Sequence, residues 1–211
     1  MSKPHICLKP PGPKPSAKRE AILDAAQRTF LEVGYAATSM DGVSSRAAVS
    51  KATIYAHFES KDQLFAAVIR RRCERSAAFA PVEDKGDARS TLRLVGRRLL
   101  DLLLQTDSLA MFRVVVAESA RQPELARAFY ESGPGAGKAQ IAAVIADLTA
   151  RGELAVAEPW QAADLFTGML RTDLFMRTLL GLPQPEGRTV EAAVEAAVEA
   201  MIKTFGAGNT R

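Results

Sequence analysis

The sequence predicts an all-α protein with about nine helices, and three observations lead to that prediction. From residue 17 onward, apolar residues recur at three- and four-residue steps, which is the spacing of one helix face. No segment alternates polar and apolar residues as a half-buried strand does. Of the 211 residues, 47% are hydrophobic and 25% are charged, a composition typical of a folded globular chain and not of a disordered or fibrous one.

The first two helices have recognisable ends. Residues 1–16 are rich in proline and lysine and lack periodicity, so we expect a basic arm without regular structure. The helix that follows is expected to stop at Gly34, because glycine readily takes the left-handed conformation of a helix end. Thr38, with Asp41 three residues later, fits the pattern of a capping box and is expected to open the second helix.

Two serines predict where the next helices start. Ser50 is expected to cap a third helix that runs through Phe58, and Ser60 is expected to cap a fourth. The fourth helix is expected to continue to about Ala80, because Pro81 cannot extend it.

The remaining two thirds of the chain predict a bundle of longer helices. A Gly-rich stretch at 132–138 resembles a phosphate-binding loop, but Ser132 and Ala139 occupy the positions that need Gly and Ser/Thr, so we expect a flexible break. Pro159 is expected to open one long apolar helix that ends near residue 180. The other expected helices span about 92–103, 109–122, 125–130, 141–152 and 189–205.

Charge is unevenly placed along the chain, whose net charge is +4. Residues 1–75 hold 13 Lys/Arg against 7 Asp/Glu, a difference of +6, whereas residues 76–211 hold 15 against 17, a difference of −2. A basic first third indicates that this end meets a polyanion. The sequence shows no signal peptide, no apolar run long enough to span a bilayer and only two cysteines, so we expect a cytoplasmic protein.

Residues 38–61 read TSMDGVSSRAAVSKATIYAHFESK, which predicts two short helices joined by a turn. This is the arrangement of a helix-turn-helix motif, whose second helix enters the major groove of DNA. Its Lys, Thr, Tyr and His side chains can reach phosphates or base edges, and the serines and arginine before it can hold backbone phosphates. The expected DNA-binding residues are Ser39, Ser45, Arg46, Ser50, Lys51, Ala52, Thr53, Tyr55, His57 and Lys61.

Residues 20–68 resemble the N-terminal DNA-binding domain of TetR-type transcriptional regulators. The resemblance depends on the AILDAA…F…GY…TSM run, the VSKATIYAHF segment and the SKDQL that follows. It implies that Thr38, Arg46 and Lys61 lie near the DNA backbone while four side chains of the second short helix face the bases. Those four residues are Lys51, Thr53, Tyr55 and His57.

The resemblance also implies a core for this domain, and the turn departs from the family pattern. The family usually has Ala-Gly-Val in the turn, where this chain has Ala47-Ala48-Val49. If residue 48 needs a positive φ, alanine costs roughly 1 kcal/mol relative to glycine. The implied core residues are Ile22, Ala26, Phe30, Val43, Ile54 and Phe58.

The rest of the chain resembles the family in architecture, and residues 175–182 are similar to its AefR-like branch. After the basic arm at 1–16 that the composition predicts, the resemblance implies a DNA-binding domain at 17–62 and a ligand-binding and dimerisation domain at 63–211. It implies a homodimeric repressor, without enzyme activity or cofactor, that leaves a palindromic double-stranded DNA operator when a small hydrophobic effector binds.

Apolar residues at helical spacing supply the candidates for the ligand pocket and the dimer interface, although such residues are also typical of an ordinary core. The expected ligand-binding residues are Met111, Phe112, Val115, Phe129, Trp160, Phe166, Met169 and Arg171. The expected dimer residues form a stripe on the last helix: Val190, Val194, Val198, Met201 and Phe205.

Two other functions stay open. Cys73, between the two modules, could make the protein a redox-sensing regulator, and a dimeric scaffold could keep the fold without reading DNA. No paired carboxylates, nucleophilic triad or metal-ligand spacing stands out, so the sequence predicts neither an enzyme nor a metal site.

Overall fold

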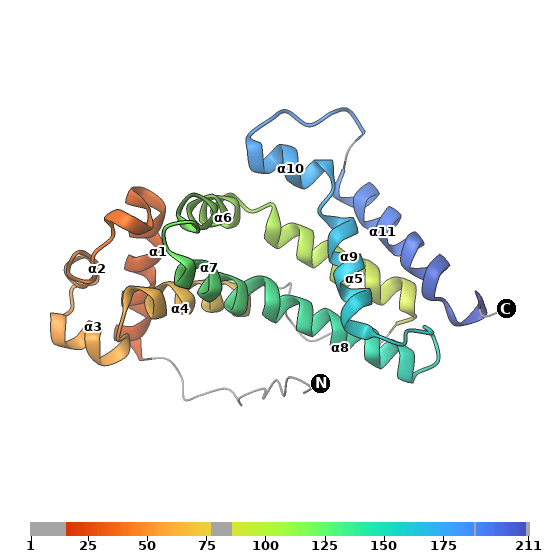
Figure 1. Cartoon of the computed structure of the whole chain (residues 1–211), viewed down its shortest axis with the longest axis horizontal. Coiled ribbons are helices and arrows are strands. Elements are labelled where there is room, and N and C mark those ends of the chain that lie inside the picture. Colours follow the sequence, from red (N-terminus) through yellow and green to blue (C-terminus); the bar gives the residue numbers. More distant parts are fainter. Residues whose placement is uncertain (1–15, 77–85, 188, 210–211) are drawn as a thin grey trace.

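The computed structural model describes residues 16–76, 86–187 and 189–209, and over these residues the predicted all-α fold is confirmed. The molecule is elongated, with α2 and α3 at one end and α11 near the other (Figure 1). Within the described residues the backbone forms no strand, only an isolated antiparallel bridge between Leu154 and Gly206. Of the expected basic arm, residues 1–15 lie outside the described residues.

The helix count is close to the predicted one. The elements are α1 (Ala17–Ala37), α2 (Met40–Arg46), α3 (Lys51–His57), α4 (Lys61–Arg75), α5 (Ala88–Leu103), α6 (Thr106–Glu118), α7 (Pro123–Tyr130), the π-helical turn η2 (Glu131–Gly135), α8 (Ala136–Ala150), α9 (Pro159–Leu170), α10 (Asp173–Leu180), α11 (Val190–Phe205) and the 3-10 turn η3 (Ala207–Asn209). The α4 helix ends at Arg75, before the expected Ala80, and residues 77–85 are not described.

The caps near the start of the chain follow local chemistry. Gly34 takes a positive φ of 81° and interrupts the helical backbone of α1, as expected of a stop. Ser39, and not Thr38, caps α2, because its hydroxyl accepts a hydrogen bond from the Gly42 amide at 3.0 Å. Thr38 instead donates its hydroxyl proton to the Gly34 carbonyl at 2.7 Å and so closes the end of α1.

A first hydrophobic core joins α1–α4 to α6 and α7. All six core residues that the resemblance implies are buried in it. Phe65 lies at its centre, with its ring 5.1 Å from that of Phe30 and 5.6 Å from that of Tyr35. Met111 and Val115 of α6 and Leu125 of α7 belong to the same core. This core therefore extends beyond the domain boundary that was expected at residue 62.

A second core joins α5, α8, α9 and α11, at the blue and cyan end of Figure 1. The α5 and α11 helices lie against each other, and three arginines on α5 form ion pairs with three glutamates on α11. Because each set repeats every four residues, the charges meet as three successive pairs along one face. The pairs are Arg89–Glu199, Arg93–Glu195 and Arg97–Glu191.

Two breaks fall elsewhere than the sequence predicts. The expected break at 132–138 is wrong: α7, η2 and α8 follow one another without interruption, and Pro134 is accommodated in the π-helical turn. Glycine at position 133 permits close packing, because a Cβ there would lie 3.2 Å from Ile69 on α4. The long helix expected at 159–180 is instead divided, since Arg171 and Thr172 have non-helical backbone angles.

Candidate DNA-binding surface and ligand cavity

The helix-turn-helix is built from α2, α3 and the turn between them. The turn has Ala48 at φ 52°, and the Val49 amide donates to the Ser44 carbonyl at 3.0 Å. Alanine therefore occupies a position with positive φ, where we expect it to be strained relative to the glycine usual in the family. Ser50 then caps α3 by accepting from the Thr53 amide at 3.1 Å.

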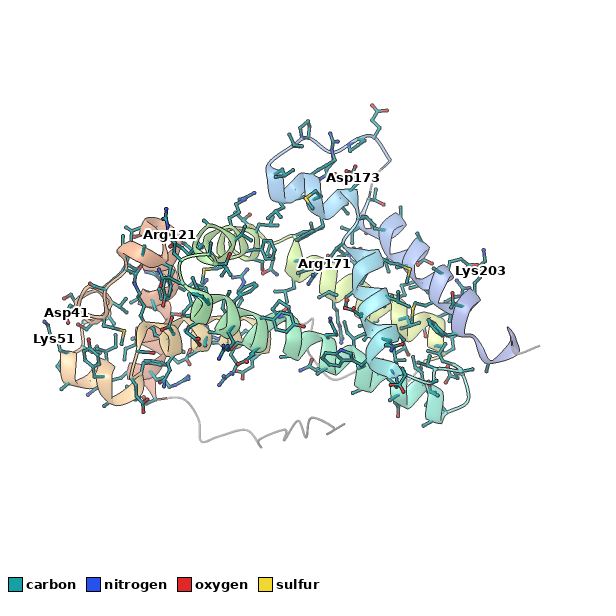
Figure 2. All side chains as sticks on the ribbon, viewed as in Figure 1. Asp41, Lys51, Arg121, Arg171, Asp173 and Lys203 are labelled. Carbon is teal, nitrogen blue, oxygen red and sulfur yellow. The ribbon has the colours of Figure 1, made fainter. Side chains whose placement is uncertain are left out.

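The α3 helix has one buried side and one exposed side. Ile54 and the adjoining Phe58 are buried in the first core and hold the helix in place. The remaining side turns outward at the end of the molecule, where Lys51 and its neighbour Asp41 are labelled in Figure 2. Its exposed residues are Lys51, Ala52, Tyr55, Ala56 and His57, while Thr53 is half-buried.

Lys51 on this surface and Arg46 beside it are each paired with an acid of the same chain. The Lys51 ammonium lies 2.5 Å from a carboxylate oxygen of Asp41, and this pair raises the pKa of Lys51. Arg46 donates both guanidinium NH2 groups to Glu32, one of them at 2.6 Å. The hydrogen bond from Arg46 lowers the pKa of Glu32. Both pairs are exposed, so water and salt weaken them and a phosphate can compete for either cation.

Two residues expected near the DNA backbone make contacts within the protein instead. Thr38 is buried against the end of α1. The Lys61 ammonium donates to the carbonyls of Tyr35 and Thr38 at 2.8 and 3.0 Å and lies 4.4 Å from the centre of the Tyr35 ring. Burial lowers the pKa of Lys61. The other expected residues, Ser39, Ser45, Arg46 and Ser50, are exposed beside α3.

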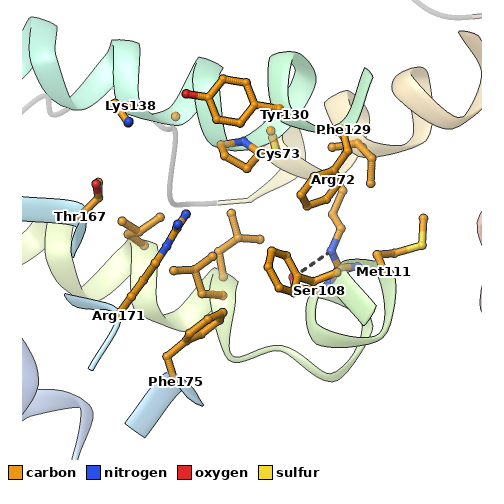
Figure 3. A pocket seen from close by; sticks show the side chains of 18 of the residues that line it. Arg72, Cys73, Ser108, Met111, Phe129, Tyr130, Lys138, Thr167, Arg171 and Phe175 are labelled. Carbon is orange, nitrogen blue, oxygen red and sulfur yellow. Dashed lines mark hydrogen bonds between the residues drawn. The ribbon is translucent and has the colours of Figure 1, made fainter. Parts of the chain in front are cut away.

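A cavity of about 190 Å³ lies between the two cores, where helices from both supply its walls (Figure 3). The first-core side is formed by α4, α6 and α7, and the second-core side by α5, α8 and α9. Within it, the ring of Phe112 lies 6.0 Å from that of Phe129 and 6.2 Å from that of Phe175, in edge-to-face arrangements. The walls are therefore largely apolar, with a few polar side chains among them.

The structure brings half of the expected pocket residues together. Met111, Phe112, Phe129 and Arg171 line the cavity. The other four do not. Val115 is buried in the first core, Phe166 is buried in the second, Met169 packs against the second, and Trp160 is exposed beneath the Lys138 ammonium at 5.5 Å. All eight side chains could line a ligand pocket, so the rotation of each helix about its axis decides which of them face the cavity.

Several polar lining residues were not predicted from the sequence. Arg72 of α4 donates from Nε to the Ser108 hydroxyl at 3.1 Å and lies 3.3 Å from an Asp107 carboxylate oxygen. Lys138 of α8 pairs with Asp164 of α9. The sequence did not indicate that these residues line a cavity, because charged residues on a helix usually face solvent.

The expected dimer stripe faces inward. Val194, Val198 and Met201 are buried in the second core of their own chain, and Val190 and Phe205 are partly buried against it. Exposed large apolar side chains occur instead on and just after the α9–α10 segment, at Leu165, Met176, Leu180 and Leu182.

Two kinds of feature are absent from the described residues. No helix among them is both long and apolar enough to cross a membrane. Over the same ranges, no group of three or more His, Cys, Asp or Glu side chains is placed to hold a metal ion.

Two family descriptions match this chain. One, for bacterial regulatory proteins of the tetR family, matches residues 22–68, and the other, for the C-terminal domain of AefR-like transcriptional repressors, matches residues 90–207. Together they span the helix-turn-helix and most of the cavity-forming helices.

Similar proteins include a transcriptional repressor and a transcriptional activator. The chain is 32% identical over 132 residues to the HTH-type transcriptional repressor Rv1474c of Mycobacterium tuberculosis, covering 63% of this chain and 64% of that one. It is 31% identical over 111 residues to the HTH-type transcriptional activator FasR of Mycolicibacterium smegmatis, covering 52% of this chain and 50% of that one. The matches thus span about half to two thirds of these relatives.

A solved structure extends the likeness to nearly the whole length. The structure of the flavonoid-responsive regulator FrrA has a TM-score of 0.75 and is 36% identical, covering 90% of this chain and 97% of that one. Sequence and fold therefore agree over both halves of the molecule, and the chain belongs to the TetR family of bacterial transcriptional regulators.

Proposed function

We propose that this protein is a homodimeric transcriptional repressor that binds a palindromic DNA operator and is released by a small hydrophobic ligand. The observation that carries the proposal is the exposed side of α3, held by Ile54 and Phe58 and flanked by Lys51 and Arg46. A helix presented in this way fits the major groove, with Tyr55 and His57 toward the bases and Lys51 toward phosphate. Such a regulator acts in the cytoplasm, where bacterial DNA lies.

A second subunit completes the DNA-binding unit. Because an operator half-site accommodates one α3, a two-fold dimer reads two half-sites of a palindrome. We assign the dimer contact to the α9–α10 segment, where Leu165 and Leu180 are 56% and 63% exposed, together with the exposed alanines Ala192 and Ala196 of α11. Exposed apolar side chains of this kind are typical of protein interfaces.

The cavity supplies the ligand response. It lies between the two cores, so a molecule bound there contacts α4 through Ile69, Arg72 and Cys73 and the second core through Leu99 and Ile141. Since α4 follows the helix-turn-helix directly, a shift of α4 changes the separation of the two α3 helices in the dimer. Operator affinity then falls because both helices no longer reach their half-sites together. The name of FrrA, which is flavonoid-responsive, supports a hydrophobic ligand of this kind.

A redox response through Cys73 has less support. Burial raises the pKa of the Cys73 thiol to about 11, so little of the reactive thiolate is present at neutral pH. Replacing Cys73 with Ser should leave the ligand response intact, whereas loss of the response would favour the redox alternative.

The decisive experiment measures binding of the full chain to DNA that flanks its own gene, by fluorescence anisotropy at several salt concentrations. Tyr55→Ala should weaken binding at least about tenfold, because a base-facing side chain is lost. Lys51→Ala should weaken binding and reduce the slope of log affinity against log salt by about one. Arg127→Ala, an exposed arginine on α7 that is paired with Glu124, serves as the control and should change neither quantity.

Unchanged affinity in both α3 variants would contradict the proposed DNA-reading role of α3. A chain that stays monomeric and binds none of the flanking fragments would contradict the function as a whole.

A further inference from the structure

The charges that line the cavity do not balance, and the excess lies on Arg171. Arg72 is paired with Asp107, and Lys138 is paired with Asp164. Within the part of the chain that the structure describes, the Arg171 guanidinium has neither an ion pair nor a side-chain hydrogen bond. Arg171 therefore brings to the cavity a positive charge that no ion pair neutralises, since Asp164, the acid whose charge acts on it, is paired with Lys138.

Arg171 is placed to meet a molecule inside the cavity. It occupies the non-helical junction between α9 and α10, and its side chain extends into the space between Lys138 and Phe175 (Figure 3). Arg171 is exposed to solvent, and the partial burial of its side chain lowers the pKa of the guanidinium, against the charge of Asp164, which raises it. The group remains charged at neutral pH, because arginine keeps its proton in proteins. Because no acid of the described residues forms an ion pair with it, the guanidinium is free to bind an anion inside the cavity.

The rest of the lining sets the shape of that anion. Beyond Arg171 the cavity continues along the aromatic cluster of Phe112, Phe129 and Phe175 toward Met111 and α4. These side chains fit a flat or aliphatic apolar body and offer it no further unpaired charge.

From this arrangement we propose that the cavity selects an amphipathic monoanion, a hydrophobic molecule with one ionised acid group that Arg171 binds. This inference rests on the proposed function and specifies the chemistry of its effector. The planar guanidinium can donate two parallel hydrogen bonds to a carboxylate or sulfonate. A neutral ligand of the same shape leaves Arg171 unpaired, so it binds more weakly.

The test uses two probes with one skeleton. 8-Anilino-1-naphthalenesulfonate carries a permanent negative charge, and N-phenyl-1-naphthylamine is the same molecule without the sulfonate. Both report binding by fluorescence with the full chain. Arg171→Gln should lower the affinity for the anionic probe roughly tenfold, the effect of losing a charge-assisted contact, and change the affinity for the neutral probe less than about twofold. Arg171→Lys keeps the charge and should recover much of the anionic affinity.

Two controls separate binding from folding and place the probes in the cavity. Arg127→Gln removes an exposed arginine outside the cavity and should leave both affinities unchanged. Gly168→Leu adds a side chain inside the cavity and should block both probes, while the thermal melt by circular dichroism shows that each variant is folded.

Equal losses for the two probes in Arg171→Gln, or no loss for the anionic probe, would overturn the anion proposal while leaving the cavity as a ligand site. If the wild-type chain bound neither probe, both this inference and the ligand response of the proposed function would be contradicted. Operator binding, measured separately, is unaffected by either result.

Discussion

The two aromatic clusters of this protein have similar residues and opposite packing. In the first core, Phe30, Tyr35 and Phe65 are at most 1% exposed, and their rings contact one another at 5.1 to 5.7 Å. At the cavity, Phe112 and Phe129 are only partly buried, and the ring of Phe112 lies 6.0 Å from that of Phe129 and 6.2 Å from that of Phe175. One cluster fills its space, and the other forms the wall of an open one.

The charges differ in the same way. Beside α3, Lys51 and Arg46 each have an acidic partner. In the cavity, Arg171 has no ion-pair partner among the described residues, because Asp164, whose charge acts on it, is paired with Lys138. The comparison shows that the helix-turn-helix has a filled core and paired cations, whereas the cavity leaves space and a cation for a ligand to contact. Filled packing keeps a reading helix in one position, while open packing allows a bound molecule to shift its walls.

The largest expected difference is in stability. Phe65→Ala should lower the free energy of unfolding by about 3–5 kcal/mol, because it removes a fully buried ring from a filled core. Phe112→Ala should cost less than about half of that, since one side of its ring already faces the cavity. Urea unfolding followed by circular dichroism measures both. Equal costs would show that the cavity is collapsed in solution, and Phe65→Leu provides a milder variant if Phe65→Ala does not fold.

Filling the open region should remove its response. Gly168 lines the cavity, and a Cβ at this position meets no heavy atom within 4 Å. Gly168→Leu should therefore abolish release of DNA by a ligand, with operator affinity in the absence of ligand kept within about threefold. Gly168→Ala is the matched control, and it should retain the response and gain up to about 1 kcal/mol of helix stability. A normal ligand response in Gly168→Leu would place the effector site elsewhere.

Relieving the backbone strain in the turn should stabilise the helix-turn-helix domain without changing the DNA that it binds. Ala48 has a φ of 52°, which glycine adopts without steric cost. Ala48→Gly should raise the free energy of unfolding by up to about 1 kcal/mol, and Ala47→Gly, at a residue whose φ of −79° suits alanine, should lower it. Thermal and urea unfolding measure the difference. A destabilised Ala48→Gly variant would mean that the turn relaxes in solution.

The smallest expected effect is on the paired charges. Asp41→Asn removes the partner of Lys51 and should strengthen operator binding severalfold at low salt, because Lys51 is then free to contact phosphate. The gain should shrink as salt rises and screens the original pair. Asp101→Asn, which removes a partner of Arg97 on α5, is the control and should not change DNA binding. Weaker binding in Asp41→Asn would indicate that the pair positions Lys51 for DNA.

The sequence by itself determined the features that depend on neighbours along the chain. Helix periodicity, the Ser50 and Ser60 caps and the stop at Gly34 follow from local chemistry, and all are present in the structure. The helix-turn-helix and the basic charge around it could be predicted for the same reason, since the whole motif lies within a single contiguous segment.

Only the tertiary structure decided which face of each helix meets which partner. Chemistry alone could not separate Phe112, which lines the cavity, from Phe166, which is buried in the second core. The stripe on α11 faces inward because α5 offers it an apolar surface and three arginines that match its glutamates. These outcomes depend on contacts between residues far apart in the sequence, and helical spacing gives the period of a face but not its partner.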